Sequence, residues 1–434
     1  MFRLCSTFYN MLASMIQLIR GFRDILPGDV ELWQHIERTA VDLFQAFGFR
    51  EIRIPVMEKT ELFARSIGDT TDIVEKEMYT FPDRKGDLIT LRPEATASIV
   101  RSYIQHKLYA KDPVQKFYMI GPMFRRERPQ KGRYRQFYQI DAEIFGVTSP
   151  LVDVQLIYLL HILFERLEVP DTNAHINSLG CPECRPDYRK RLVRFLDSVV
   201  DRLCADCRRR KDVNPLRVLD CIVPSCREAL ADAPSIIDSL CDDCRKDFDI
   251  VQENLVKLAI PYAVDKRLVR GLDYYNRTTF EMQTGLLGAQ SAVAGGGRYD
   301  GLIEMLGGPP LPATGFAIGF DRLAEVCELD HTRFRNAPDV FIAALGEDSQ
   351  KLAFEWLCAL GKQGIHAELD YQDRSLKSQM KQAGRQNARH VLIVGDAELS
   401  KGTAILRDMI SKSQTDIPLA EIVEILSRRL VPDS

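Results

Sequence analysis

Apolar positions recur at two different spacings in the first part of the chain. Residues 31–47 carry apolar side chains three and four positions apart, which predicts a helix that Gly48 ends. Residues 50–57 alternate apolar and polar positions, which predicts a strand in which Pro55 ends the regular pairing. The same reasoning predicts strands at 87–91, 116–124 and 136–145 and a helix at 95–108. These elements favour an antiparallel sheet with helices on one side.

The rest of the chain changes composition twice. Residues 180–249 are rich in Cys, Arg and Asp, which indicates an inserted module. Glycines and strand-like spacing return over residues 268–319. Beyond Asn336-Ala-Pro338 the pattern alternates again, and it predicts strands at 340–345 and 390–394 and helices at 350–360 and 418–430. We therefore predict an α+β fold with an extension at 1–19, a core at 20–179 and 250–333, the insertion at 180–249, and a C-terminal α/β domain at 337–434.

Composition excludes several classes of protein. The chain has 434 residues, 45% hydrophobic and 27% charged, which is enough apolar material for large cores and excludes a disordered chain. Lys and Arg total 58 against 61 Asp and Glu, so a histone-like polycation is excluded, although a local basic patch could still bind nucleic acid. No apolar stretch reaches the ~20 residues that a membrane helix needs. The most apolar segment, 151–164, contains polar residues, and we interpret it as a buried or interface helix.

Eight of the eleven cysteines lie between Cys181 and Cys244. This clustering is too local for a disulfide framework of the whole chain, so we expect a reducing, cytoplasmic compartment. The C-x-x-C spacings are typical of metal ligands, and eight thiols would fill two tetrahedral Cys₄ zinc sites. The candidate ligands are Cys181, Cys184, Cys204, Cys207, Cys221, Cys226, Cys241 and Cys244. The alternative is a set of thiols without metal that forms occasional disulfides.

Basic and glycine-rich segments carry the candidate chemistry. Residues 124–137, FRRERPQKGRYRQF, hold six basic side chains and one acid between two predicted strands. Guanidinium groups bind phosphate through a fixed fork of donors, although a solvated basic hairpin would have the same pattern. Residues 314–323 predict a strand entering a helix, in which Gly315 and Gly319 would permit close approach of a flat base. Residues 294–301 form a second glycine-rich segment that matches neither a P-loop nor a dinucleotide fingerprint.

In this order, these segments resemble the three signature motifs of class II aminoacyl-tRNA synthetases, and within that class the histidyl-tRNA synthetase family. The segments that resemble the shared motifs are 48–55, which is the dimer-forming motif, 124–143 and 315–323. The segments that resemble the histidine-specific motifs are 268–276, LVRGLDYYN, and 296–300, GGRYD. Residues 20–27 resemble the opening segment of the family, and the resemblance covers roughly residues 18–430.

The resemblance implies a histidine–tRNA ligase. Such an enzyme joins L-histidine to ATP as histidyl-adenylate and then transfers histidine to the 3′ end of tRNA(His), with Mg²⁺ assisting at the pyrophosphate. It also implies a class II catalytic core at 20–179 and 250–333, an insertion that contacts the tRNA acceptor arm, and an anticodon-binding domain at 337–434. A cytoplasmic homodimer that does not associate with membranes is implied as well.

The family match assigns roles to individual residues. The expected catalytic residues are Arg125 for the α-phosphate, Arg322 for the γ-phosphate, and Arg270 for the carboxylate and α-phosphate. Adenylation needs positioned positive charge more than bond chemistry, so three arginines suit the step. The expected histidine-binding residues are Glu94 for the α-ammonium with Thr96 and Gln139 beside it, Glu143 and Tyr275 for the imidazole nitrogens with Tyr274 adjoining them, and Tyr299 as a pocket wall.

Two rival interpretations belong to other functional classes. A synthetase-like regulatory subunit of ATP phosphoribosyltransferase is non-catalytic and typically lacks the anticodon domain, whereas the C-terminal domain and the three arginines are present in this sequence. A zinc-ribbon nucleic-acid adaptor would explain only the cysteines. Two small departures from the family pattern are Ala95, where many relatives carry Gly, and Asp321, where many carry Glu. If the insertion serves only the acceptor arm, metal loss should weaken tRNA charging more than histidine activation.

Overall fold

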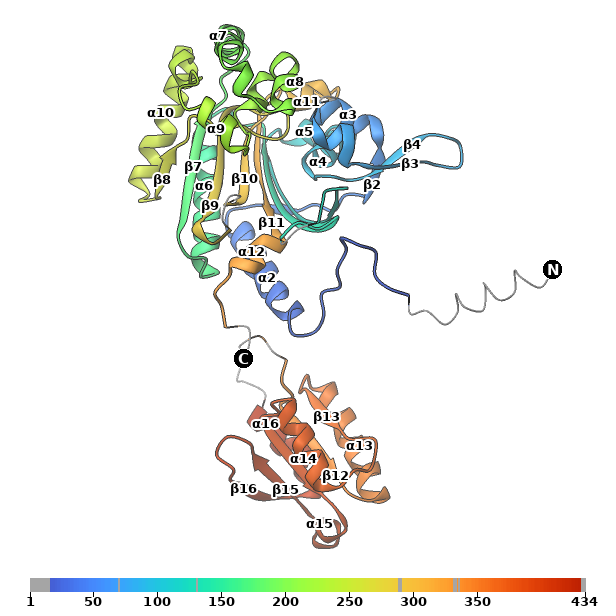
Figure 1. Cartoon of the computed structure of the whole chain (residues 1–434). Coiled ribbons are helices and arrows are strands. Elements are labelled where there is room, and N and C mark those ends of the chain that lie inside the picture. The colour runs from blue at the N-terminus through green and yellow to red at the C-terminus, as the bar shows by residue number, and fades with distance from the viewer. Residues whose placement is uncertain are drawn as a thin grey trace, which may run out of the picture. The chain divides into compact units, whose positions relative to one another are not determined.

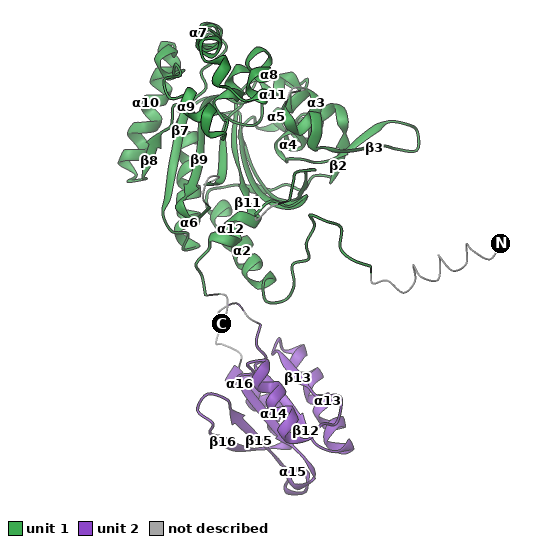
Figure 2. Ribbon diagram, viewed as in Figure 1, with its two compact units in different colours: residues 1–331 green, residues 332–434 purple. Residues whose placement is uncertain are grey.

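The chain folds into two compact units, residues 1–331 and 332–434, which Figure 2 colours separately. The computed structural model describes residues 16–68, 71–129, 132–287, 291–330, 334 and 336–430. Most of the expected extension at 1–19 therefore lies outside the described residues, as do two positions of the basic 124–137 segment. Among the helices that are described, none has the length and apolar character needed to cross a membrane.

An eight-stranded sheet forms the centre of the first unit (Figure 1). Its order is β1-β5-β6-β11-β10-β9-β7-β8, and pairing is antiparallel from β5 across to β7. Only the edge strands β1 and β8 pair parallel to their neighbours. The strands are β1 (Arg50–Glu51), β5 (Gln115–Phe124), β6 (Gln136–Phe145), β7 (Thr172–Ser178), β8 (Tyr262–Val264), β9 (Asn276–Thr284), β10 (Ala292–Arg298) and β11 (Ala313–Gly319). The expected antiparallel sheet is confirmed.

Helices cover both faces of this sheet, so the expectation of helices on one side is wrong. On one face, α6 (Leu151–Arg166) contacts β9, β10 and β11, and α2 (Val30–Ala46) packs against α6 and α12 (Phe320–Val326). On the other face, Tyr103 of α4 (Thr96–Gln105) stacks on Phe145 with ring centroids 4.7 Å apart. Side chains of β5 alternate between the faces, because Tyr118 stacks on Phe44 of α2 while Phe117 packs with Phe145.

The strand expected at 50–57 is also wrong, because two sheets share that segment. After β1 the Ile52 amide still donates to the Tyr118 carbonyl oxygen at 2.9 Å, but Pro55 has no amide hydrogen to continue the ladder. The chain then enters a three-stranded sheet of β2 (Met57–Lys59), β4 (Leu88–Leu91) and β3 (Tyr79–Pro82). The remaining short elements of this region are α3 (Thr60–Ile67), the π-helix η1 (Ile73–Glu77), α5 (Leu108–Lys111), the 3₁₀ turn η5 (Gly285–Leu287) and α11 (Leu302–Met305).

The cysteine-rich insertion is helical and follows β7. Its helices are α7 (Arg185–Ser198), α8 (Ala205–Val213), α9 (Pro224–Ala229) and α10 (Asp242–Lys257), joined through the 3₁₀ turns η2 (Val200–Arg202), η3 (Pro215–Val218) and η4 (Ile237–Ser239). Figure 1 shows α7 to α10, in green to yellow-green, gathered at one end of the long strands. Most of the buried apolar side chains of the insertion belong to the same apolar core as Tyr274, Tyr275 and Tyr299.

The second unit is a five-stranded sheet with helices on both faces. Its order is β13-β12-β14-β15-β16, in which β12 pairs parallel with β13 and β14, and β15 pairs antiparallel with β14 and β16. The elements are β12 (Val340–Ala344), α13 (Glu347–Lys362), β13 (Ala367–Leu369), α14 (Leu376–Arg385), β14 (His390–Val394), α15 (Asp396–Lys401), β15 (Thr403–Asp408), β16 (Gln414–Pro418), η7 (Leu419–Glu421) and α16 (Ile422–Leu430). The α/β character is confirmed, but the last helix begins at Ile422 rather than Pro418, because residues 414–418 extend the sheet.

Candidate active site

A cavity of about 640 Å³ collects most of the predicted site residues. It is lined by strands β6, β9, β10 and β11, by the 269–275 segment, and by part of the insertion. Eight of the ten predicted catalytic and substrate-binding residues line it: Glu94, Thr96, Arg125, Gln139, Arg270, Tyr274, Tyr275 and Arg322. The other two, Glu143 and Tyr299, do not line the cavity and are almost completely buried. The cavity therefore joins side chains from segments that are far apart in the sequence.

Acidic side chains lie at the floor of the cavity and buried behind it because of the alternation along β6. Gln139, Asp141 and Glu143 occupy every second position of this strand, so their side chains share one face. Asp141 was missed by the sequence analysis, although its period-two spacing from Gln139 and Glu143 was the available signal. Burial, with Glu143 and Glu94 nearby, raises the pKa of Asp141 well above its usual value. Among the described residues, neither carboxylate oxygen of Asp141 has a hydrogen-bond partner.

Glu143 is held from two sides by hydroxyl groups. The Thr96 hydroxyl donates to Oε1 of Glu143 at 2.6 Å, and the Tyr299 hydroxyl donates to Oε2. Burial raises the pKa of Glu143 to about 8, against the opposing effect of these two hydrogen bonds. Gly315 pairs with Glu143 across β11 and β6, and a Cβ at Gly315 would overlap the Glu143 carboxylate. The sequence analysis expected Gly315 to admit a nucleotide base, whereas its missing side chain makes room for Glu143.

Glu94 lies at the start of α4, where its Oε1 accepts a hydrogen bond from the Ala97 amide at 3.0 Å. Burial raises the pKa of Glu94, and Arg125 acts in the opposite direction. Three tyrosines close the same region: the rings of Tyr274 and Tyr275 are 4.7 Å apart, and Tyr299 meets both edge-on. Burial raises the pKa of Tyr275 to about 12, so its phenol keeps its proton at neutral pH.

Arg270 faces the cavity from the 269–275 segment. Its guanidinium donates to Glu281 of β9 and lies over the Tyr275 ring, with Cζ 5.7 Å from the ring centroid. Gly295 of β10 provides the space, because a Cβ there would overlap the guanidinium group. Glu281 was another residue that the sequence analysis missed, since nothing in its local pattern separates it from an ordinary strand acid.

Arg125 and Arg322 reach the cavity from the two shared motifs. Arg125 Nε donates to the Pro93 carbonyl oxygen at 2.9 Å, and its guanidinium lies over the Phe137 ring. Arg322 donates to the Ala292 carbonyl oxygen at 2.7 Å. Burial, together with the neighbouring charge of Arg133, lowers the pKa of Arg322. Three arginines therefore bring positive charge to a cavity whose floor is acidic.

The opening segment fixes the basic loop from outside the cavity. The Arg135 amide donates to the Gly21 carbonyl oxygen at 2.7 Å, and Arg23 pairs with Asp321 at 2.8 Å. Asp321 also accepts a hydrogen bond from the Tyr138 amide at 2.8 Å. The Asp at position 321, a departure from the family pattern, therefore links the opening segment, β6 and α12.

Arg298 of the GGRYD segment makes contacts that hold the fold together. It pairs with the fully buried Asp153 of α6 at 2.9 Å and donates to the Ser149 carbonyl oxygen at 2.7 Å. These bonds fix the segment that carries Tyr299, so a buried ion pair positions the phenol that binds Glu143.

The eight predicted metal ligands form two groups outside the cavity. One group is Cys181, Cys184, Cys241 and Cys244, and the other is Cys204, Cys207, Cys221 and Cys226. In each group the sulfur atoms all lie within 4.8 Å of one another. Across the described part of the chain, these are the sets of three or more side chains with metal-binding geometry. For Mg²⁺, which usually binds one or two carboxylates together with substrate phosphates, Glu127 and Glu281 line the cavity.

Replacing Glu143 with Gln should change how stability depends on pH. The folded chain holds the Glu143 proton between the ordinary carboxyl pKa of 4.5 and about 8, whereas the unfolded chain releases it. The free energy of unfolding of the parent chain should therefore fall as pH rises through that window. Glu143→Gln does not titrate, so its melting temperature relative to the parent should rise from pH 5 to pH 8 and then level off. Scanning calorimetry without ligands tests this, and a difference independent of pH contradicts it.

Comparison with known proteins finds family matches in both units. A family model described as histidyl-tRNA synthetase matches residues 21–183 and 196–323, and one described as anticodon binding domain matches residues 339–429. The histidine–tRNA ligase of Desulfatibacillum aliphaticivorans is 64% identical over 93% of this chain and 97% of its own length. That of Desulfosudis oleivorans is 60% identical over 94% of this chain and 97% of its own length.

Solved structures agree in fold. Apo S. aureus histidyl-tRNA synthetase has a TM-score of 0.79 and 36% identity, with coverage of 95% of this chain and 100% of that one. A Bacillus halodurans protein titled ATP phosphoribosyltransferase regulatory subunit/histidyl-tRNA synthetase has a TM-score of 0.64 at 19% identity, covering 88% of this chain and 98% of that one. The second likeness shows the shared fold alone.

Proposed function

The chain belongs to the histidyl-tRNA synthetase family and catalyses histidine–tRNA ligation, and we propose how its cavity performs the two steps. One observation carries the proposal: a single cavity combines a buried acidic floor on β6 with three arginines from separate segments. An acidic floor suits the ammonium and imidazole of histidine, and the arginines suit its carboxylate and the phosphates of ATP.

In the first step a carboxylate oxygen of histidine attacks the α-phosphorus of ATP. A new P–O bond forms, and the bond to the pyrophosphate leaving group breaks. We assign Arg270 and Arg125 to the charge that develops at the α-phosphate, and Arg322 to the γ-phosphate. Glu127 and Glu281, which line the cavity and pair with Arg125 and Arg270, are the carboxylates that would hold magnesium, and the ion would supply positive charge to the pyrophosphate. Because both reactants are bound, most of the rate gain comes from positioning and electrostatics.

Histidine recognition is assigned to the acidic floor. Glu94 takes the α-ammonium with help from Thr96 and Gln139, and the Asp141 carboxyl, whose oxygens have no hydrogen-bond partner among the described residues, offers a further acceptor there. Glu143 and Tyr275 are assigned to the two imidazole nitrogens, because a carboxyl group and a phenol can satisfy one donor and one acceptor. Tyr274 and Tyr299 wall the pocket.

In the second step a ribose hydroxyl at the 3′ end of tRNA(His) attacks the histidyl carbonyl carbon. The ester bond forms, AMP leaves and the hydroxyl proton is released. The anticodon-binding domain, matched over 339–429, favours this reaction over the regulatory-subunit interpretation. The reducing cytoplasm stays the proposed compartment, and the described cysteines are free of disulfides.

The direct test is ATP–pyrophosphate exchange with each of the twenty amino acids, followed by charging of tRNA. We expect exchange with histidine alone and histidine-dependent charging of tRNA(His). Exchange with another amino acid would contradict the specificity, and exchange without charging would contradict the ligase assignment.

A homodimer is proposed from the first motif and from exposed apolar side chains beside it. Met57 and Phe81 lie on the same face of the three-stranded sheet and are 49% and 41% exposed, and Val56, just before β2, is 40% exposed. Such a patch is typical of a subunit interface.

Introducing charge into this patch should produce monomers. Light scattering after size exclusion should give twice the chain mass for the parent and the chain mass for Met57→Glu/Phe81→Glu, because burying two carboxylates opposes association. The control is Ile410→Glu, a similarly apolar and exposed position in the second unit. A monomeric parent, or a dimeric double variant, would contradict this interface.

A further inference from the structure

We propose that the insertion binds two zinc ions in nested Cys₄ sites, and that the inner site holds Arg217 against the backbone of Arg270. The outer site consists of Cys181, Cys184, Cys241 and Cys244, and the inner site of Cys204, Cys207, Cys221 and Cys226. The metal assignment stands on the thiol geometry alone. Only its consequence for Arg270 rests on the proposed function.

Distances between the thiols match a tetrahedral metal site. In the outer site, Sγ of Cys181 is 3.6 Å from Sγ of Cys184 and 3.7 Å from Sγ of Cys241. In the inner site, Sγ of Cys204 is 4.0 Å from Sγ of Cys221. Zinc–sulfur bonds of about 2.3 Å in a tetrahedron place sulfur atoms about 3.8 Å apart. A disulfide requires about 2.05 Å between two sulfur atoms and cannot join four thiols at once.

The two sites repeat the same local backbone. Cys204 and Cys241 each precede a helix, with φ and ψ of −66° and 164° in the first case and −65° and 165° in the second. In both sites the cysteine three positions later lies in the first helical turn. The Cys204 amide donates to Sγ of Cys226 at 3.1 Å, and the Cys241 amide donates to Sγ of Cys184 at 3.2 Å. Two sets of thiols that bind no metal would not be expected to share this geometry.

Apolar packing contributes little to the stability of α8 in the inner part of the insertion. Of the nine residues of α8, ADCRRRKDV, only Cys207 has a buried side chain. A helix this short and polar is not stable by itself in water. Cys207 and Cys226, which anchor α8 and α9, are both completely buried. A metal bound through these thiols would supply the folding free energy that the apolar surface does not provide.

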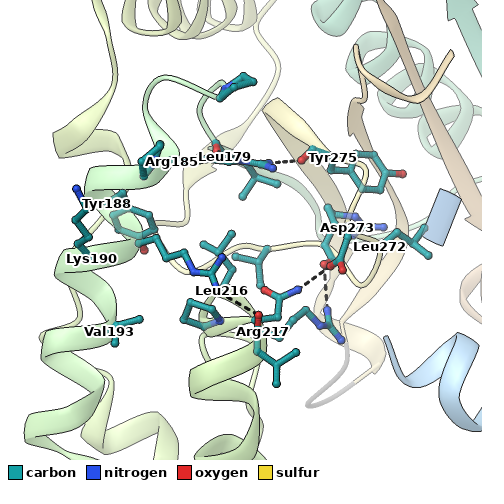
Figure 3. A pocket seen from close by; sticks show the side chains of 18 of the residues that line it. Leu179, Arg185, Tyr188, Lys190, Val193, Leu216, Arg217, Leu272, Asp273 and Tyr275 are labelled. Carbon is teal, nitrogen blue, oxygen red and sulfur yellow. Dashed lines mark hydrogen bonds between the residues drawn. The ribbon is translucent and has the colours of Figure 1, made fainter. Parts of the chain in front are cut away.

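The order of the ligands along the chain nests one site within the other. The outer site joins the start of α7 to the start of α10 and so closes the base of the insertion. That base is bonded to the catalytic core: Arg185 donates to the Tyr275 carbonyl oxygen, and Arg277 pairs with Asp247 of α10 at 2.6 Å. Figure 3 shows Arg185 reaching across to Tyr275.

The inner site closes the segment that contacts Arg270. Residues 207 and 221 are ligands, and η3 between them carries Arg217. Arg217 donates to the Arg270 carbonyl oxygen at 3.0 Å and to Asp220, the residue before Cys221, at 3.1 Å. Asn214, at the start of the same turn, donates to Asp273 at 2.8 Å. These contacts lie around a second cavity of about 900 Å³ behind the 269–275 segment (Figure 3).

This arrangement changes the expected effect of losing metal. Arg217, Asp220 and Ile222 of the insertion line the same cavity as Arg270, so the insertion does more than flank the acceptor arm. Loss of the inner zinc would release η3 and with it the support under Arg270. Histidine activation should therefore fall together with tRNA charging, whereas the sequence predicted that metal loss would weaken charging more than activation.

Metal content is the first test and needs no variant. Full-length protein purified without chelator should carry two zinc ions per chain by plasma mass spectrometry. Replacing zinc with cobalt should give the intense thiolate-to-cobalt absorption and the visible bands of tetrahedral cobalt. Zinc-free protein without these bands overturns the proposal.

Variants assign the ligands to the two sites. Cys204→Ser/Cys226→Ser and Cys181→Ser/Cys244→Ser should each lower the zinc content from two ions to one. Cys327→Ala and Cys358→Ser are the controls, because these cysteines lie outside both groups, and they should keep two ions. Loss of both ions in the inner-site variant, or of neither ion in either variant, overturns the nested assignment.

The link to Arg270 is tested by changing Arg217 without touching a ligand. Arg217→Met should keep two zinc ions while lowering kcat for histidine-dependent exchange at least 10-fold, with a smaller change in the histidine KM. Arg217→Lys keeps one donor and should recover part of the loss, which a merely structural role would not predict. Arg191→Met, an exposed position on α7, is the matched control and should behave as the parent. Unchanged exchange in Arg217→Met overturns the link. A parent with two zinc ions and no exchange would instead count against the proposed function.

Discussion

Replacing Arg270 with Ala should lower histidine-dependent pyrophosphate exchange by about 10²–10³-fold, comparable to the loss of one oxyanion donor. Arg270 is the cation assigned nearest to the charge that develops on the α-phosphate. It is also fixed before substrate binds, because Glu281, the Tyr275 ring and the open side of Gly295 define its position. A preorganised cation of this kind costs little reorganisation during the reaction, so its loss should affect kcat strongly.

A control variant and a second measurement distinguish a loss of catalysis from a loss of folded protein. Arg267→Ala removes an exposed arginine three positions earlier and should leave exchange within about 2-fold of the parent, as is usual for surface changes. Transfer of histidine from preformed adenylate to tRNA should suffer less in Arg270→Ala than adenylation does, because the α-phosphate attack is then complete. Near-parental exchange in Arg270→Ala would remove this residue from the mechanism.

Replacing Gly315 with Ala should disable the histidine pocket. An added Cβ would overlap the Glu143 carboxylate and lie 2.7 Å from the Ala142 carbonyl oxygen. Neither group can retreat easily, because Gly315 is paired with Glu143 across two central strands and Glu143 is held by Thr96 and Tyr299. Overpacking of a filled core costs about 1–3 kcal/mol. We expect kcat/KM for histidine in exchange to fall by about 10–100-fold or more, with the KM for ATP affected less.

Two further variants identify the cause of this loss. Gly301→Ala adds the same methyl group where nothing lies within 4 Å and should behave as the parent. Gly315→Ala/Glu143→Ala removes the main overlap, so its melting temperature should recover toward the parent while its exchange activity stays low. If Gly315→Ala binds histidine normally, the close approach of Gly315 to Glu143 has no role in the pocket.

Repeating local signals made the elements available from sequence, whereas the residue roles came from the resemblance to the synthetase family. The 3.6-residue spacing gave the helix at 31–47, observed as Val30–Ala46, and strand-like spacing gave 136–145, observed with the same bounds. Both depend on side chains within one element, so no knowledge of partners was needed. The alternation at 50–57 failed for the opposite reason, since it could not reveal that β1 and β2 belong to different sheets. The sequence pattern also gave no sign that residues of the insertion contact Arg270.

The amino-acid sequence revealed which kinds of chemical group the protein carries: arginines and acids in ordered motifs, and eight thiols at metal-ligand spacing. The tertiary structure decided which of these groups meet. Asp141 joined the site only because β6 turns every second side chain toward one cavity, and Gly315 proved to make room for a carboxylate rather than a base. The thiols divided into nested groups because the start of α10, with Cys241 and Cys244, lies beside the start of α7, with Cys181 and Cys184. Spacing along a chain fixes local geometry, but long-range contacts depend on how whole elements pack, and that is set by the complete core.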